Sequence, residues 1–255
     1  MTHQLPWQQL GGIGIIGGLG PLAGAHVYEC LVRMTPAVSD QEHPSVVLLS
    51  RPFPSRIAHL GAAAESPLPQ LVDAARSLGS LGCTVVGLAS ATTHAYRRAI
   101  EEQAGVPIAD GLREVAGELR AREASAAVVL CTSAARQVGL YNDVWPDGVA
   151  LRYPAPAEQT VVDGLIDNVK TGAIRASDAA VLHDLILRHT DESTVVVLGC
   201  TELPVLWVPR ERASRVVSVS DAIAGAVLAA AGLADRRRHG CGCFSSRPRD
   251  MGSAA

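Results

Sequence analysis

One strand-and-loop segment recurs in this chain after 110 positions, and this repeat constrains the fold more than any other feature of the sequence. Thr84–Ser90 reads TVVGLAS and Thr194–Cys200 reads TVVVLGC. Repetition in the same order is typical of duplicated structural units. We therefore expect two similar halves related by a pseudo-twofold axis. Three further pairs of segments correspond: residues 13–21 with 128–135, 46–56 with 151–158, and 106–110 with 216–221.

Short apolar runs alternate with longer segments of helical periodicity. The runs are continuous, which indicates strands that are buried on both faces. A repeated strand–helix order predicts parallel sheets with right-handed crossovers, so the expected fold class is α/β. The expected strands are residues 13–16, 46–49, 85–88, 127–130, 195–198 and 216–219. The expected helices are residues 22–34, 67–81, 111–122, 158–171, 176–188 and 221–231.

The repeat also suggests a division into domains. We expect residues 1–105 with 216–234 to form the first α/β domain, residues 106–215 to form the second, and residues 235–255 to be a disordered tail. Ligands of parallel α/β sheets bind beyond the carboxyl ends of the strands. Ser90 and Cys200 follow such ends, one in each half. The active site is therefore expected in a cleft between the halves, where these two residues face each other.

Composition narrows the range of partners. The formal net charge is −3 and 18% of the 255 residues are charged, so no strong field favours nucleic acid or a membrane surface. The chain has no apolar run of about 18 residues, the length that spans a bilayer. Its six cysteines lack the spacing of a disulfide framework, and its histidines lack the spacing of metal ligands. We expect a cytoplasmic protein with a small-molecule partner, no metal, and no nucleic-acid or membrane contact.

A glycine-rich loop follows the first expected strand. Residues 12–17 fit GxGxxG, but the pattern lies within the strand instead of opening a helix, which argues against a dinucleotide site. Gly18 and Gly20 precede the next helix, where bare backbone N–H groups can bind an anion such as a carboxylate. The alternative is a tight turn that needs glycine for its dihedral angles.

Two motifs resemble those of the aspartate/glutamate racemase family. Gly14–Ala23 (GIIGGLGPLA) is similar to the opening motif of aspartate racemases, and Gly199–Pro204 (GCTELP) is similar to their second cysteine motif. Glu202 in place of histidine favours the aspartate branch. The likeness runs from about residue 13 to 231 and includes Arg56 and Lys170.

The resemblance implies a cofactor-independent isomerase in which two cysteines flank the substrate Cα. A thiol, with an ordinary pKa of about 8.5, serves as base or acid near neutrality. Arg56 and Lys170 would hold substrate carboxylates. A homodimer is expected because compact enzymes of this kind are often dimers. The remaining residues expected to bind the small carboxylate or amino-acid substrate are Gly18, Gly20, Thr92, Thr93, Thr132, Thr201 and Glu202.

The chain departs from the family pattern at the first cysteine. Relatives read roughly Cys-Asn-Thr-x-His, whereas this chain has Ser90-Ala91-Thr92-Thr93-His94. A hydroxyl is a far weaker acid than a thiol, so Ser90 and Cys200 form an unequal catalytic pair. Three outcomes are open: Ser90 relays a proton through a supporting His94 or water, Cys200 acts alone, or the site takes a less polar substrate.

Alternative functions remain at this stage. The leading hypothesis is an amino-acid racemase or epimerase acting on aspartate, glutamate or a related acid. A single-cysteine decarboxylase or cis-trans isomerase of a small dicarboxylic acid is the second, and a non-catalytic carboxylate-binding homologue is the third. For single residues, Cys200 could be a packed apolar group and Ser90 could cap the helix that follows it.

Overall fold

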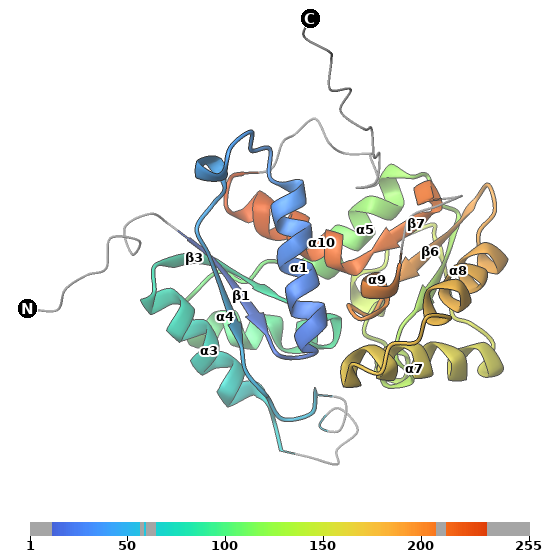
Figure 1. Cartoon of the computed structure of the whole chain (residues 1–255), viewed down its shortest axis with the longest axis horizontal. Coiled ribbons are helices and arrows are strands. Elements are labelled where there is room, and N and C mark those ends of the chain that lie inside the picture. Colours follow the sequence, from blue (N-terminus) through green and yellow to red (C-terminus); the bar gives the residue numbers. More distant parts are fainter. Residues whose placement is uncertain (1–11, 57–58, 60–64, 208–212, 234–255) are drawn as a thin grey trace, which may run out of the picture.

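A computed structural model describes residues 12–56, 59, 65–207 and 213–233. The tail expected at residues 235–255 lies outside the described residues. Figure 1 shows two lobes side by side, each with a parallel sheet. The expected α/β fold with two similar halves is therefore confirmed.

The first sheet has three parallel strands in the order β2-β1-β3. β1 is buried throughout, because β2 and β3 pair with its two edges. A parallel bridge between Val86 and Ile108 extends the sheet beyond β3. The strands span Gly12–Gly17 (β1), Val46–Ser50 (β2) and Cys83–Leu88 (β3). The other elements of this half are α1 (Pro21–Met34), η2 (Asp40–Glu42), α3 (Leu68–Ser80), η3 (Ala91–Tyr96) and α4 (Arg97–Ala104).

The second sheet has four parallel strands in the order β5-β4-β6-β7. β4 and β6 are fully buried, as their unbroken apolar sequences predict. The strands span Ala126–Leu130 (β4), Ala150–Arg152 (β5), Thr194–Leu198 (β6) and Val216–Ser218 (β7). The other elements are α6 (Ser133–Gln137), η4 (Asn142–Val144), α7 (Pro156–Thr171), α8 (Asp178–His189), α9 (Leu203–Leu206) and η5 (Ala213–Arg215).

The two sheets repeat the same order of pairing. β6 lies between β4 and β7 just as β3 lies between β1 and the bridge at Ile108. This agrees with the sequence repeat, in which residues 106–110 correspond to 216–221. Because the strands are parallel, the loops after β3 and β6 leave the carboxyl edges of their sheets, where ligands of α/β proteins bind.

Two helices join the halves. α5 (Gly111–Ala121) and α10 (Val219–Ala230) pack against each other in the middle of the molecule. α10 also packs on α1 and β3 of the first half, although β7, which precedes it, belongs to the second sheet. The domain boundary expected at residue 216 stays a prediction. Of the two elements that follow it, β7 pairs with the second sheet and α10 packs on the first half.

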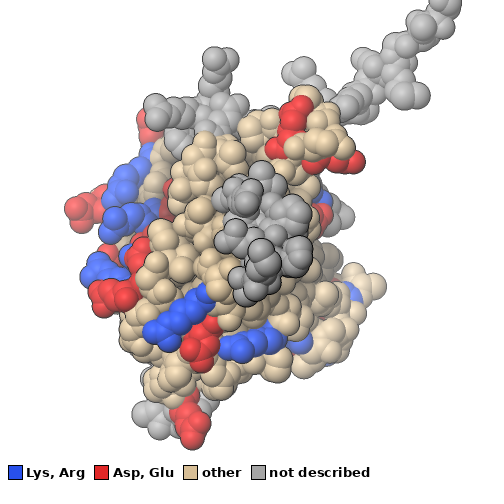
Figure 2. Space-filling model, turned by 90° about the vertical axis from the view of Figure 1, so that its left-hand side faces the viewer, with Lys and Arg blue, Asp and Glu red and all other residues tan. Residues whose placement is uncertain are grey.

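The surface carries charges of both signs. On the face in Figure 2, blue and red side chains lie next to each other and much of the surface is neither. Elsewhere in the chain, neighbouring charges on one helix also pair, for example Arg97 with Glu101 at 2.9 Å. No helix within the described ranges combines the length and apolar character that crossing a membrane requires.

Candidate active site

The two predicted catalytic loops meet where the halves join. Ser90 follows β3, Cys200 follows β6, and the Thr201 hydroxyl donates across the junction to the Ala89 carbonyl at 3.4 Å. This contact links positions 112 residues apart in the sequence. Both residues are buried: Cys200 is 8% exposed and Ser90 is 4% exposed. Both residues therefore offer only a small part of their surface to solvent.

Cys200 has a carboxylate as its direct partner. Its thiol donates to Glu202 Oε2 at 2.8 Å, and Glu202 is itself 2% exposed. Burial raises the pKa of Cys200 well above its ordinary value, and the charge of Glu202 adds to this rise. The resting pair is therefore a neutral thiol beside an acceptor that is placed to take its proton.

The glycine loop after β1 lies against the same carboxylate. Gly20 has φ +136°, and a Cβ at this position would lie 2.3 Å from Glu202 Oε1. Gly18 has φ +74°, and a Cβ there would lie 2.0 Å from the Arg51 carbonyl oxygen. Both positions thus require glycine for conformation and for space. The loop predicted to receive an anion lies against a carboxylate of the protein itself in this structure.

Two cations reach this cluster from opposite halves. Arg56 Nη2 donates to the Leu19 carbonyl at 2.6 Å, and its Nε is buried without a hydrogen-bond partner among the described residues. Burial lowers the pKa of Arg56, while the charges of Glu202 and Cys200 act in the opposite direction. Lys170 lies in the last turn of α7, and its charge lowers the pKa of Cys200 against the stronger effect of burial.

The first-half loop uses its hydroxyls and its histidine differently. Ser90 makes no cap of the short helix that follows, and its Oγ lies 3.1 Å from Thr92 Oγ1. The Gly111 N–H donates to His94 Nε2 at 3.2 Å, so the ring proton is on Nδ1, which donates to the Ser90 carbonyl at 3.0 Å. Burial lowers the pKa of His94, which favours this neutral ring. Both nitrogens are engaged by backbone, so His94 has none left to relay a proton from Ser90 Oγ.

Two other predicted threonines differ in their surroundings. Thr132 accepts from the Ala135 N–H at 3.1 Å and so caps α6, a structural role for its hydroxyl. Thr93 is completely buried, and its hydroxyl has no hydrogen-bond partner among the described residues. Thr93 is thus the threonine of this group with hydrogen-bonding capacity to spare.

Sequence reasoning underrated two residues that support this region. Tyr141 is fully buried and donates to the Gly199 carbonyl at 2.6 Å, which fixes the backbone just before Cys200. Gln159 is buried and donates to the Cys131 carbonyl at 2.8 Å, at the end of β4. A third, Tyr96, lies at the end of η3, near Arg56. None of these three residues belongs to a recognised motif. The one signal in the sequence is that each carries a polar group close to an apolar run.

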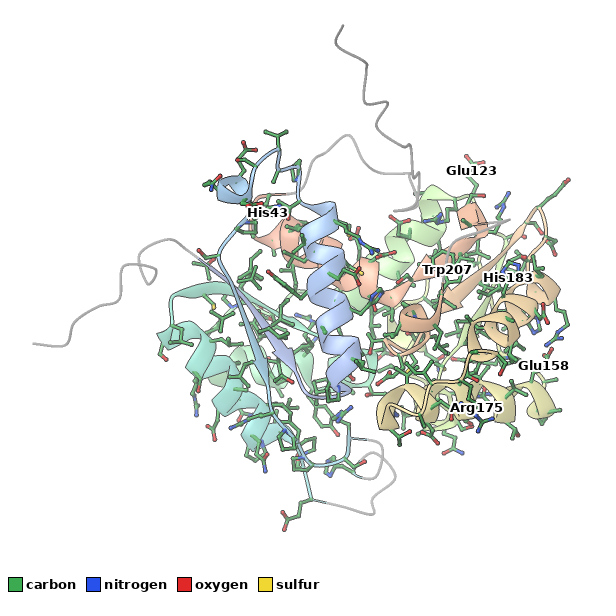
Figure 3. All side chains as sticks on the ribbon, in the orientation of Figure 1. His43, Glu123, Glu158, Arg175, His183 and Trp207 are labelled. Carbon is green, nitrogen blue, oxygen red and sulfur yellow. The ribbon has the colours of Figure 1, made fainter. Side chains whose placement is uncertain are left out.

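Two other polar residues that the sequence did not assign to the site, Glu158 and His183, lie away from it. In Figure 3, Glu158 and His183 project at the outer side of the second half, on α7 and α8. Glu158 pairs there with His189 at 2.9 Å and with Arg188 at 3.2 Å. No group of three or more His, Cys, Asp or Glu side chains in the described part of the chain is arranged to hold a metal ion.

Comparison with known families identifies the group to which these motifs belong. The family model described as Asp/Glu/Hydantoin racemase matches residues 16–230, which include both predicted catalytic loops. The chain belongs to the Asp/Glu/hydantoin racemase family. The resemblance seen in the sequence is thereby confirmed at the level of the family.

Solved structures agree with membership of this racemase family. An aspartate racemase from Picrophilus torridus is 27% identical, with 90% of this chain and 98% of that chain covered and a TM-score of 0.77. A glutamate racemase from Francisella tularensis in complex with D-glutamate is 14% identical, with 89% of this chain and 84% of that chain covered and a TM-score of 0.61. A maleate cis-trans isomerase mutant from Nocardia farcinica with a covalently bound succinylcysteine intermediate is 18% identical, with 87% of this chain and 92% of that chain covered and a TM-score of 0.55. The last two show the shared fold alone.

Proposed function

We propose that the chain is a cofactor-independent amino-acid racemase or epimerase that acts on aspartate, glutamate or a related acid. The observation that carries the proposal is the Cys200 thiol, held 2.8 Å from a buried carboxylate beside the Ser90 loop of the opposite half. The 27% identity to an aspartate racemase over almost its whole length supports the acidic substrate.

The proposed chemistry begins with the resting thiol. Glu202 takes the Cys200 proton, and the resulting thiolate removes the α-proton from one face of the substrate, so that the substrate becomes a carbanion and Cys200 a thiol again. Lys170, whose charge acts on Cys200, supplies positive charge close to the place where negative charge develops, and Arg56 holds a carboxylate of the substrate. Return of a proton by Cys200 regenerates the starting enantiomer, and return from the Ser90 side produces the other.

The Ser90 hydroxyl makes the two faces unequal. Donation by Ser90 leaves an alkoxide, which recovers its proton from water because the neighbouring Thr92 hydroxyl is no stronger an acid. We therefore expect α-proton exchange through Cys200 to be faster than inversion. The two faces of the substrate would be served by groups of very different acidity.

Heavy water provides the direct test. The folded protein is incubated separately with the L- and D-forms of aspartate and glutamate, and loss of the α-proton signal is followed by NMR while chiral chromatography follows the opposite enantiomer. We expect α-proton exchange without added cofactor. Exchange should be faster than inversion, and one enantiomer should exchange faster than the other. If none of the four compounds exchanges its α-proton, the proposal is wrong.

One observation favours a second candidate function. The pair contains a single thiol, and the maleate isomerase with the same fold was captured with succinate linked to a cysteine. Addition of the Cys200 thiolate to the alkene of a maleate-like acid, rotation, and elimination would isomerise it with the thiolate restored. Formation of fumarate from maleate, without α-proton exchange of any amino acid, would select this function.

The role proposed for Glu202 gives a prediction about thiol reactivity. Replacing Glu202 by glutamine removes the charge that helps raise the pKa of Cys200. Because the thiolate is the reactive form, alkylation of Cys200 at pH 8 should accelerate by about tenfold for each unit by which the pKa falls. Rates measured from pH 6 to 10 with iodoacetamide, with mass spectrometry to identify Cys200, should show the profile moved to lower pH.

The same variant should lose catalytic activity, because glutamine cannot accept the thiol proton. Faster alkylation together with slower α-proton exchange would separate a proton acceptor from a simple packing residue. Replacing Glu158 by glutamine, at the outer side of the second half, serves as the matched control and should change neither rate. Unchanged exchange in the Glu202 variant would contradict the assigned role.

A further inference from the structure

Tyr96 carries a buried hydroxyl with no hydrogen-bond partner in the described part of the chain. Its ring packs against the first-half core and lies 6.0 Å from the ring of His59, centroid to centroid. Burial of an unsatisfied hydroxyl costs free energy, so such a group calls for an explanation.

Arg56 places this hydroxyl beside the proposed active site. Arg56 donates to the carbonyl of Leu19, and a Cβ on the next residue, Gly20, would lie 2.3 Å from Glu202 Oε1, so the guanidinium lies near the Cys200–Glu202 pair. The Tyr96 ring packs near that of His59, three positions after Arg56, and Arg56 and Tyr96 each shift the pKa of the other. The guanidinium uses Nη2 for the Leu19 carbonyl but leaves Nε without a partner in the described structure. Two hydrogen-bonding groups with no partner, one cationic and one phenolic, thus lie at the same end of the site.

These two groups match one kind of ligand. Burial raises the pKa of Tyr96, so the phenol stays protonated at neutral pH and can donate. An O–H and a guanidinium N–H together suit the two oxygens of a carboxylate. Tyr96 ends the short helix η3 that begins directly after Ser90, so it lies six positions beyond the residue next to which the substrate Cα would react. In a dicarboxylic amino acid, the carboxylate farther from the Cα is that of the side chain.

We propose that Tyr96 is a specificity-determining residue that binds, together with Arg56, the side-chain carboxylate of a dicarboxylic substrate. The inference rests on the proposed function for its choice of substrate, and it deepens that function by assigning the residue that separates dicarboxylic from monocarboxylic amino acids. It concerns a residue outside the two motifs that carry the family resemblance.

Replacing Tyr96 by phenylalanine tests the assignment with a signature that a structural role cannot produce. Among the described residues the hydroxyl has no partner to lose, so thermal stability should be unchanged or higher. Binding of succinate, measured by isothermal titration calorimetry on the full chain, should weaken by at least about tenfold, because a hydrogen bond to a charged group is lost. The matched control is Tyr153→Phe, which removes another buried hydroxyl without a described partner, near Arg136. It should leave succinate binding unchanged.

Kinetics separate this inference from the proposed function. With aspartate, the Tyr96 variant should raise KM while kcat for α-proton exchange stays near that of the wild type, and exchange of alanine should not change. Equal succinate affinity in wild type and Tyr96→Phe, or no succinate binding by the wild type, overturns the inference. If succinate binding depends on Tyr96 but no amino acid exchanges its α-proton, the carboxylate subsite stands and the racemase proposal fails.

Discussion

Replacing Cys200 by alanine should lower the rate of α-proton exchange by about 10²–10⁴-fold, the usual contribution of one general acid–base group. Cys200 is the thiol that follows β6 and donates to the buried Glu202 carboxylate, the contact on which its proposed role as base depends. Exchange is measured by NMR in heavy water with the enantiomer that the wild type exchanges faster. Succinate binding should persist, because Arg56 and Tyr96 are untouched.

A cysteine elsewhere in the same fold provides the matched control. Cys83 begins β3, at the opposite end of that strand from Ser90, and it is 5% exposed. Cys83→Ala removes the same atoms from a site of similar burial, so it reports the effect of a lost sulfur on folding alone. Loss of exchange in both variants to the same extent would argue that the Cys200 effect is structural. Retained exchange in Cys200→Ala would eliminate this thiol as the base.

Most strands could be predicted because buried strands appear in the sequence as continuous apolar runs. β4 and β6 are unbroken apolar runs, and a strand buried on both faces has to be apolar at successive positions. β5 was missed because it is three residues long and only partly buried. α4 was missed because Ile100 is its single buried residue, which leaves little apolar periodicity to detect.

The candidate site was predictable only as far as its motifs. The position of Cys200 after a strand follows from the repeat, and the contact between its loop and Ala89 follows from the pairing of the halves. The role of His94 did not follow, because it depends on the N–H of Gly111, seventeen residues along the chain. Tyr96 was missed for a related reason: its relation to Arg56 comes from the way two loops pack.

Replacing Ser90 by cysteine should increase the rate of inversion by about 10²-fold or more relative to the wild type. A thiol with an ordinary pKa of about 8.5 exchanges protons near neutrality, whereas a serine hydroxyl releases its proton far less readily. Ser90 Oγ contacts Thr92 Oγ1 at 3.1 Å and caps no helix, so the substitution breaks no contact on which the fold depends. Chiral chromatography of aspartate incubated with the variant measures inversion from each enantiomer.

The double variant Ser90→Cys, Cys200→Ser tests whether the two loops flank the substrate, because it moves the single thiol from one proposed face of the substrate to the other. If the two loops flank the Cα, the enantiomer that exchanges its α-proton faster in heavy water should switch from one to the other. Loss of all exchange would show that Glu202, which accepts the hydrogen bond of the thiol after β6, is needed to activate the thiol. Retention of the original preference would mean that Ser90 and Cys200 do not face opposite sides of the substrate, and the two-sided mechanism would be wrong.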